Sequence, residues 1–267
     1  MSEYIAEKET YVTRDVVTYN GNALVTGKKE LVKEISYQIY VNNRRAGDMI
    51  CSPWGREKAF LGYLFLKGYI SSAGDVRATD IDEERRIVNI TIRDYLTEHP
   101  GEESMLNAEE AVLNQQTIAS ERSSDDVRLS VEEVLAFSRE LEDRSALYHR
   151  TGGVHCAAFV RDGKFLSYQE DISRHVAVDK VVGDCLLRKI PMRQGILIFS
   201  GRVPVEILQK VGAMGCSILI AKSAPTNYSC DLAQKLGITL IGFARDETFN
   251  IYSHPERVFS GNEPFAG

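Results

Sequence analysis

Three short polar segments in the C-terminal half of the sequence each follow an apolar run. They are Ser200-Gly201-Arg202, residues 223–226 and residues 243–246. If the runs before them are parallel strands, all three segments open on one edge of a sheet, which is where α/β proteins bind ligands. Gly201 permits a ligand to approach the backbone closely, and the helix N-termini that follow the first two segments attract anions. The spacing therefore predicts a pocket for a small ligand that carries phosphate.

The side chains of these segments fit that chemistry, although a simpler interpretation competes with it. Arg202, Lys222 and Arg245 supply positive charge to the same edge. Serine or threonine at the start of a helix often only caps it, which is the alternative for any one segment taken alone. Three segments together favour a site. The residues concerned are Ser200, Gly201, Arg202, Ser223, Ala224, Pro225, Thr226, Phe243, Ala244, Arg245 and Asp246.

A second polar cluster begins at Glu170-Asp171 and enters a predicted helix. His175 and Asp179 are four residues apart on one helical face, so we expect their side chains to pair. Arg174 at the helix start could hold a phosphate group, and His175 could donate a hydrogen bond to one. A solvent-exposed helix end with a local ion pair explains the same residues equally well, and both interpretations stay open.

Motifs that would assign a known enzymatic chemistry are missing from the sequence. There is no P-loop, no G-x-G-x-x-G after a strand, no G-x-S-x-G and no pair of zinc-deaminase motifs. The five histidines are dispersed, and we predict no metal ligand and no catalytic residue. Cys156 follows His155 on a predicted strand, where neighbours point to opposite faces, so we expect a core residue and not a nucleophile.

Composition indicates an ordinary globular protein of 267 residues, 43% hydrophobic and 26% charged. The formal net charge of −6 weighs against broad nucleic-acid binding. The start of the chain has no apolar signal region, and the longest apolar runs are too short to span a bilayer. Five cysteines without C-x-x-C spacing favour a reducing compartment. We therefore expect a cytoplasmic protein with no nucleic-acid or membrane partner.

The first part of the chain predicts a small α+β unit over residues 1–97. The first 10 to 25 residues are polar, and we expect them to be mobile. Period-two alternation predicts a strand over residues 35–41, and Asn42-Asn43 predicts a hairpin turn to a strand at residues 47–51. Ser52-Pro53 resembles a helix start, with Ser52 as the N-cap, and a further strand is expected at residues 86–94.

The rest of the chain predicts an acidic connection followed by an α/β domain. We expect residues 98–129 to be a mobile connection with one short helix at residues 108–116. Ser130 and Glu133 form a capping box that opens a helix, and Asp162-Gly163 predicts a hairpin. Strands and helices then alternate to residue 243. Residues 130–267 are therefore expected to form a layered α/β domain with a mixed, partly parallel sheet.

Six motifs, spread over most of the chain, together resemble one known family. They are T-G-G-V-H at residues 151–155, E-D-x-x-R-H-x-A-x-D-K at 170–180, S-G-R at 200–202, S-A-P-T at 223–226, G-F-A-R at 242–245 and Y-x-H-P-x-R at 252–257. This combination is similar to the formate dehydrogenase accessory protein family (FdhD/NarQ). The resemblance covers residues 34–257, apart from residues 99–128.

The resemblance implies a fold, a cargo and partners. It implies a cytidine-deaminase-like α/β domain without zinc, and a homodimer. It implies binding of the bis-molybdopterin guanine dinucleotide cofactor, with a guanine nucleotide as a possible mimic, and transfer of sulfur to it from a cysteine desulfurase before insertion into formate dehydrogenase. The family's cofactor-binding stretch falls on Phe243, Ala244, Arg245, Asp246, Glu247 and Thr248.

One departure from the family pattern concerns the sulfur step. The family's persulfide motif, of the type C-G-x-C-G, precedes the T-G-G segment, but residues 99–150 here contain no cysteine. Either the protein delivers the cofactor without carrying sulfur, or Cys156 carries it, or a partner supplies it. We expect that no cysteine is both exposed and next to the phosphate pocket. Other classes that we considered are a nucleotide-converting enzyme and a nucleotide-sensing module.

Overall fold

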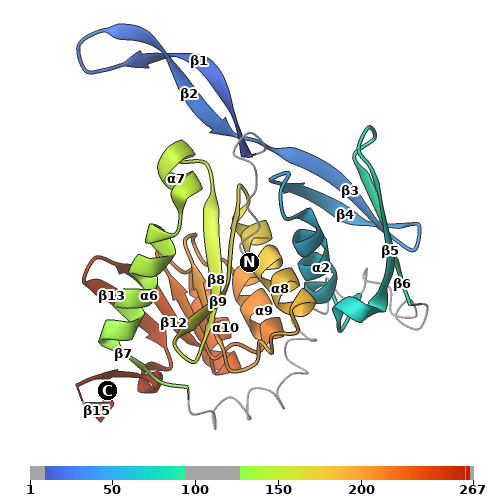
Figure 1. The fold of residues 1–267 in the computed structure, drawn as a ribbon. Helices are drawn as coiled ribbons and strands as arrows, with labels where there is room; N and C mark the ends of the chain where they lie inside the picture. The colour runs from blue at the N-terminus through green and yellow to red at the C-terminus, as the bar shows by residue number, and fades with distance from the viewer. Residues whose placement is uncertain (1–9, 94–126, 262, 265–267) are drawn as a thin grey trace.

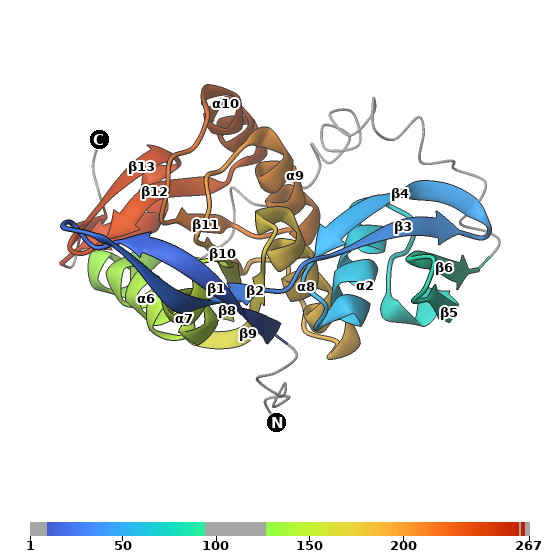
Figure 2. The same ribbon diagram turned by 90° about the horizontal axis from the view of Figure 1, so that it is seen from above.

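The computed structural model describes residues 10–93, 127–261 and 263–264, which form a hairpin arm, a small unit and a large unit (Figure 1). Seen from above, the small and large units lie side by side, with helices α2 and α8 where they meet (Figure 2). The expected connection at residues 98–129, with its short helix, falls almost wholly outside the described residues. None of the helices in the described part of the chain is long and apolar enough to cross a bilayer.

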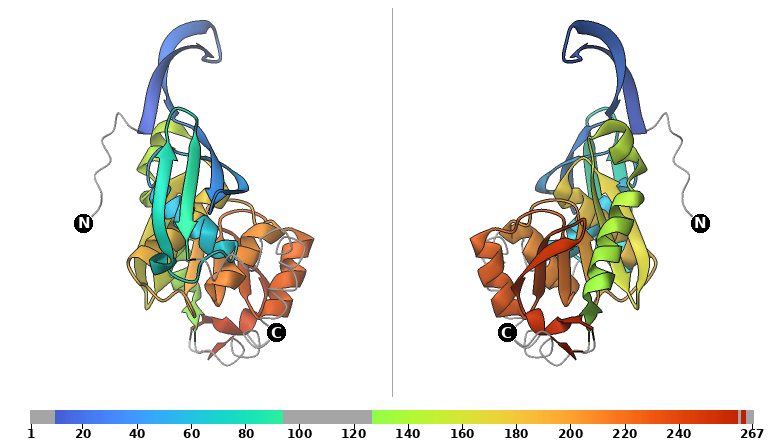
Figure 3. Two further views of the ribbon diagram at one scale, coloured as in Figure 1. Left: turned by 90° about the vertical axis from the view of Figure 1, so that its right-hand side faces the viewer. Right: turned by 90° about the vertical axis from the view of Figure 1, so that its left-hand side faces the viewer.

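The arm is an antiparallel hairpin of β1 (Tyr11–Tyr19) and β2 (Leu24–Val32), where we had expected no regular structure. It stands clear of both units (Figure 3). Its base is fixed to the large unit by Arg150, which pairs with Glu30 and lies 4.3 Å from the ring centre of Tyr11. Both faces of the arm are largely exposed. Its sequence therefore lacks the apolar–polar alternation that is typical of a half-buried strand.

The small unit packs helix α2 (Arg56–Leu66) on a four-stranded sheet in the order β4-β3-β6-β5. Its strands are β3 (Ile35–Val41), β4 (Arg44–Cys51), β5 (Val76–Asp82) and β6 (Ile87–Ile92), with a 3-10 turn at Ala73–Asp75. The predicted turn is confirmed, since Asn42 and Asn43 both adopt positive φ. Strand β5 was not predicted, because its side chains are mostly exposed.

The predicted start of α2 is wrong. The helix begins at Arg56 and its N-cap is Gly55, in the left-handed conformation with φ 61°. Ser52 is fully buried, and its hydroxyl donates to Asp171 Oδ2 at 2.6 Å across the junction with the large unit. A charged acceptor gives a stronger hydrogen bond than a helix terminus, so the serine is used there and not as a cap.

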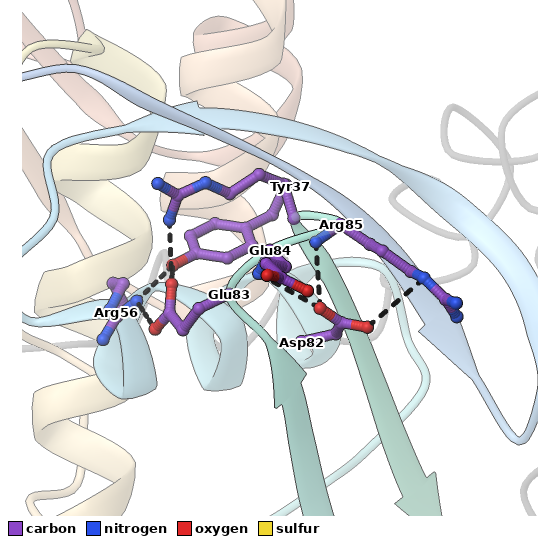
Figure 4. A network of polar contacts seen from close by, with 7 residues as sticks. Tyr37, Arg56, Asp82, Glu83, Glu84 and Arg85 are labelled. Carbon is purple, nitrogen blue, oxygen red and sulfur yellow. Dashed lines mark hydrogen bonds and ion pairs between the residues drawn. The ribbon is translucent and has the colours of Figure 1, made fainter.

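A polar network fixes the β5–β6 turn to α2 and β3 (Figure 4). Glu83 accepts hydrogen bonds from the Tyr37 hydroxyl at 2.9 Å and from Arg56 at 2.5 Å. Asp82 closes the turn itself, since its Oδ1 accepts from the backbone N–H groups of Glu84 and Arg85. Together these contacts hold the small sheet against the start of its helix.

The large unit is a three-layer α/β domain with a six-stranded sheet in the order β13-β12-β11-β10-β8-β9. Strands β10, β11 and β12 are parallel, and β8, β9 and β13 are antiparallel to their neighbours, so the predicted mixed sheet is confirmed. Its elements are β7 (Leu129–Ser130), α6 (Val131–Asp143), α7 (Ala146–Thr151), β8 (His155–Arg161), β9 (Lys164–Asp171), α8 (Arg174–Leu187), β10 (Ile196–Phe199), α9 (Val205–Met214), β11 (Ile218–Ala221), α10 (Asn227–Leu236), β12 (Thr239–Arg245), β13 (Thr248–Ser253), a 3-10 turn (Pro255–Arg257), β14 (Val258–Ser260) and β15 (Glu263–Pro264).

Alternate residues of the central strands face two different cores, which fixes the layers. Leu197 and Phe199 of β10 pack with α8, α9 and α10, whereas Ile196 and Ile198 pack with α6. Such strands are buried on both faces and read as continuous apolar runs, which is why they were predicted from the sequence. The Ser130 capping box at the start of α6 is also confirmed, since Glu133 N–H donates to the Ser130 hydroxyl at 3.1 Å.

Helices α2 and α8 approach so closely that their backbones touch at two glycines. A methyl group on Gly62 would overlap the carbonyl oxygen of Asp179, and one on Gly183 would overlap that of Lys58. Backbone atoms in two packed helices cannot yield as a side chain can. The two glycines therefore set the distance between the small and the large unit.

We expect Gly62→Ala to destabilise the protein by about 3 kcal/mol or more, at or above the usual range for overpacking. Urea unfolding measures the effect. The matched control is Gly74→Ala, because Gly74 is exposed and a methyl group there makes only ordinary contacts. Equal midpoints for the two variants would show that the helices can separate freely.

Candidate functional site

A cavity of about 520 Å³ opens where the carboxyl ends of β10–β12 meet the start of β8. The end of α6, the α7 region and the segment between β9 and α8 complete its wall. Its lining residues are Glu142, Ser145, Tyr148, Gly152, Gly153, Val154, His155, Cys156, Ile172, Ser200, Lys222, Ser223, Arg245 and Asp246. In the part of the chain that the structure describes, no group of three or more His, Cys, Asp or Glu side chains could hold a metal.

Ser200 fastens the end of β10 to the start of β8 inside the cavity. Its backbone N–H donates to the Cys156 carbonyl oxygen at 3.0 Å, and its hydroxyl accepts from the Cys156 N–H at 3.0 Å. The same hydroxyl lies 3.4 Å from Nδ1 of His155. Ser200 therefore joins the end of β10 to two neighbouring residues of β8, both of which line the cavity.

The cationic edge of the cavity consists of one arginine and one lysine. Lys222 pairs with Glu142 of α6, and this hydrogen bond holds the pKa of the Glu142 carboxyl below its usual value. Arg245 donates to the Lys222 carbonyl oxygen at 3.0 Å. It makes no ion pair with the carboxylates in the described part of the chain. Its exposed guanidinium is therefore available to an anion.

The predicted cofactor-binding stretch, residues 243–248, forms a bulge and the β12–β13 turn beside the cavity. The β12–β13 pairing shifts register between Gly242 and Arg245, and Phe243 and Asp246 both adopt positive φ. Bulges of this kind re-aim side chains next to binding sites. Phe243 is 37% exposed, and the Arg245 guanidinium lies 5.8 Å from its ring centre. An exposed aromatic ring beside a free cation is suited to a planar, negatively charged ligand.

The structure brings together only part of the predicted site. Four of the predicted residues line the cavity, namely Ser200, Ser223, Arg245 and Asp246. Ala244 is buried, and its carbonyl oxygen accepts from Ser138 of α6. Glu247 and Thr248 are exposed on the turn. The other candidate residues therefore lie outside the lining.

The loops after β10 and β11 place their remaining residues outside the lining. Gly201 is buried and Arg202 is exposed, on the same sheet edge as Arg245 because β10 and β12 are parallel. Thr226 caps α10, since its hydroxyl accepts from Ser229 N–H at 3.2 Å, as the simpler interpretation held. The carbonyl of Ala224 and the backbone of Pro225 join this loop to Val203.

The predicted pairing of His175 with Asp179 is wrong. Asp179 is buried and pairs with Lys210 of α9, which also donates to the His175 carbonyl oxygen at 3.1 Å. Burial lowers the pKa of His175 to about 4, and the charges of Lys210 and Arg174 act in the same direction. Lys210 of α9 thus pairs with Asp179 in place of His175.

The part of the site that sequence reasoning missed comes from α6 and α7. Glu142, Ser145 and Tyr148 line the cavity, yet they precede the T-G-G segment and belong to no polar motif of their own. Ser145 donates to Glu170 at 2.9 Å, and burial raises the pKa of that carboxyl. The T-G-G-x-H motif was the only sequence signal close to this wall, since Gly152, Gly153 and His155 line it too.

The expectation about cysteines is confirmed. Cys156 lines the cavity but is only 5% exposed, and its thiol points to the Leu141 carbonyl oxygen at 4.0 Å. Cys51, Cys185 and Cys216 are fully buried. Cys230 is half-buried on α10, away from the cavity lining. No cysteine of the chain is therefore both exposed and adjacent to the site.

We expect Cys156 to react with iodoacetamide at pH 7 at least about tenfold more slowly than an exposed thiol, because only an accessible thiolate reacts. Burial raises the pKa of the Cys156 thiol, so its thiolate fraction is small at neutral pH and the rate should rise as the pH increases. Peptide mass spectrometry measures the rate, with the half-buried Cys230 as the internal reference. Faster labelling at Cys156 than at Cys230 would contradict the prediction.

The fold and site define a class: a layered α/β protein with a cavity at the carboxyl edge of its parallel strands that Lys222 and Arg245 line. Residues 32–259 match the FdhD/NarQ family, and the chain belongs to that family. It is 33% identical to the sulfur carrier protein FdhD of Staphylococcus haemolyticus and 32% identical to that of Bacillus licheniformis. Both alignments cover 94% of this chain and 98% of the relative.

A solved structure has the same fold. It is a protein from Desulfotalea psychrophila assigned as a formate dehydrogenase accessory protein, with a TM-score of 0.75 at 24% sequence identity. The match covers 94% of this chain and 100% of the other. At this identity the likeness concerns the fold alone, and it extends over both the small and the large unit.

Proposed function

We propose that this protein is an accessory factor for formate dehydrogenase that binds the bis-molybdopterin guanine dinucleotide cofactor as its cargo and delivers it. The observation that carries the proposal is the cavity at the carboxyl edge of β10–β12, with the unpaired Arg245 on its rim. Membership of the FdhD/NarQ family supports it, as do relatives named sulfur carrier proteins.

The cargo is a large polyanion, and the cavity offers groups that suit its parts. Arg245 can bind a diphosphate through two parallel N–H···O bonds. Phe243 offers a ring on which a guanine base can stack. Gly152 lacks a side chain and has open space where one would be, so the ligand can approach the backbone there. The cavity is smaller than the complete cofactor, and the exposed turn at residues 243–248 provides the remaining contact surface.

The relatives are named sulfur carrier proteins, but this chain lacks a cysteine suited to carrying sulfur. Transfer of a persulfide requires a thiolate that is accessible to both donor and acceptor. Residues 99–150 contain no cysteine, and Cys156 is buried with a raised pKa. We infer that this protein presents the cofactor while a partner, the cysteine desulfurase, brings the sulfur. Incubation with desulfurase and cysteine should then leave no adduct of about 32 Da, one sulfur atom, on the protein. A rapid, transferable adduct on Cys156 would restore a carrier role.

Complementation tests the accessory role. A strain that lacks its own accessory protein should regain formate dehydrogenase activity when it expresses this chain. In parallel, guanosine diphosphate should raise the melting temperature of the purified protein, because a ligand that binds the native state stabilises it by mass action. Binding without complementation would favour a nucleotide-sensing module, and turnover of the nucleotide would favour an enzyme.

Two further parts of the proposal concern the state of the protein in the cell. We propose that it acts in the cytoplasm, where its free cysteines remain reduced. We also propose that it is a homodimer, which light scattering coupled to size exclusion measures directly. A mass of one chain at working concentration would contradict the second part.

A further inference from the structure

The Arg174 side chain makes no hydrogen bond or ion pair in the described part of the chain. Arg174 begins α8, and its Nε is buried without a hydrogen-bond acceptor. A buried donor left unsatisfied costs about 1–3 kcal/mol. Native structures keep such groups where water or a ligand completes them. A bound ligand or water that accepts a hydrogen bond from this Nε–H would therefore remove an energetic cost.

The carboxylate of Asp171, three residues before Arg174 in the sequence, is bonded to other groups. Asp171 pairs with Lys180 at 2.7 Å and accepts from both the N–H and the hydroxyl of Ser52. Its other oxygen accepts from Ser173 N–H at 2.8 Å. These four contacts engage both oxygens of Asp171, and no hydrogen bond or ion pair joins this carboxylate to Arg174.

Arg174 lies next to the strand end that carries Ser200. Its Cβ lies about 3.4 Å from where a side chain at Gly201 would start, so it faces the end of β10. Burial lowers the pKa of His155, and the charge of Arg174 lowers it further, which places the guanidinium within electrostatic range of this cavity residue. The Ser173 side chain does not cap α8, so the N–H groups of its first turn add to the positive end.

We propose that Arg174, together with His155 and Ser200 of the cavity wall, forms a second anion subsite, named the inner subsite, which takes a phosphate group. The proposal rests on the proposed function, since the phosphate would belong to the same cargo. Arg245 and Lys222 form the outer subsite on β11 and β12, while the second subsite lies on β8, β10 and α8. A cofactor with two dinucleotide arms carries two diphosphates, and two separate subsites can hold both.

The two subsites respond to different substitutions, which allows a direct test. Inorganic phosphate is the probe for the inner subsite, followed through the side-chain NMR signals of His155 and His175. Phosphate should shift the His155 signal in the wild type and in Arg245→Gln. In Arg174→Gln the apparent affinity for phosphate should fall at least tenfold. The matched control is Arg139→Gln, which removes an exposed arginine of α6 that lies outside the cavity lining.

The outcomes separate this inference from the proposed function. If guanosine diphosphate fails to bind the wild type, the proposed function fails. If it binds but phosphate leaves His155 unshifted, or if Arg174→Gln responds like Arg139→Gln, the inner subsite is refuted. Should Arg174→Gln unfold, Arg174→Lys keeps the charge but loses the planar fork, and a weaker but measurable phosphate response supports the subsite. An unchanged response in the lysine variant would refute the bidentate role of Arg174.

Discussion

Replacing Arg245 with glutamine should weaken binding of guanosine diphosphate by about 10- to 100-fold, which corresponds to roughly 1.5–3 kcal/mol for a lost charge-assisted hydrogen bond. The side chain is exposed, and its only polar contact that the structure shows is with the Lys222 carbonyl oxygen. The fold should therefore survive the substitution. Isothermal titration calorimetry measures the affinity, and circular dichroism checks the fold.

Arg139→Gln is the matched control for this experiment as well, because it changes the net charge equally without touching the cavity. A general loss of electrostatic attraction would weaken both variants alike, and it would diminish at high salt. Full affinity in Arg245→Gln, with the fold intact, would return Arg245 to the role of a solvated surface residue.

The second large effect should come from the buried ion pair between the units. Replacing Lys180 with methionine should destabilise the protein by about 3–5 kcal/mol, the usual cost of leaving a buried partner charge unpaired. Lys180 and Asp171 are both fully buried, and the ammonium group also donates to the Ser52 hydroxyl at 2.6 Å and the Glu170 carbonyl oxygen at 3.1 Å. Removal of the lysine therefore exposes several acceptors to an apolar environment.

Urea unfolding measures this loss, and two comparisons make it specific. Arg45→Gln breaks an exposed ion pair with Asp48, and it should change stability by less than about 1 kcal/mol. The double variant Lys180→Met with Asp171→Leu should be more stable than the single one, since no unpaired charge remains. A double variant that is less stable than the single one would show that the pair itself is net stabilising.

Local patterns in the sequence were enough to predict most elements and one edge of the site. Asn42-Asn43, Asp162-Gly163 and the Ser130 capping box act over two to four residues, so the chain around them encodes their geometry. The apolar runs of β10, β11 and β12 predicted buried strands. Their order along the chain then placed the polar segments after them at a common edge, because parallel strands end on the same side.

Interactions between distant residues decided the remainder. Ser52 meets Asp171 across 119 positions of sequence, and Asp179 meets Lys210 across 31, so neither partner could be read from its own neighbourhood. In both cases the local prediction, a helix cap or an i, i+4 pair, gave way to a buried charge that required a stronger partner.

The cavity shows the same division between sequence and tertiary structure. The sequence alone predicted Arg245 and the Ser200 hydroxyl as parts of the site, and both line the cavity. Only the packing of α6 against the sheet brought Glu142 and Ser145 to the cavity wall, and only the Ser200 contacts joined the start of β8 to the end of β10. Short-range hydrogen bonds and strand connectivity depend on consecutive residues, so the sequence predicts them. Burial of charge and closure of a cavity depend on which surfaces the folded chain brings together, and that is decided in three dimensions.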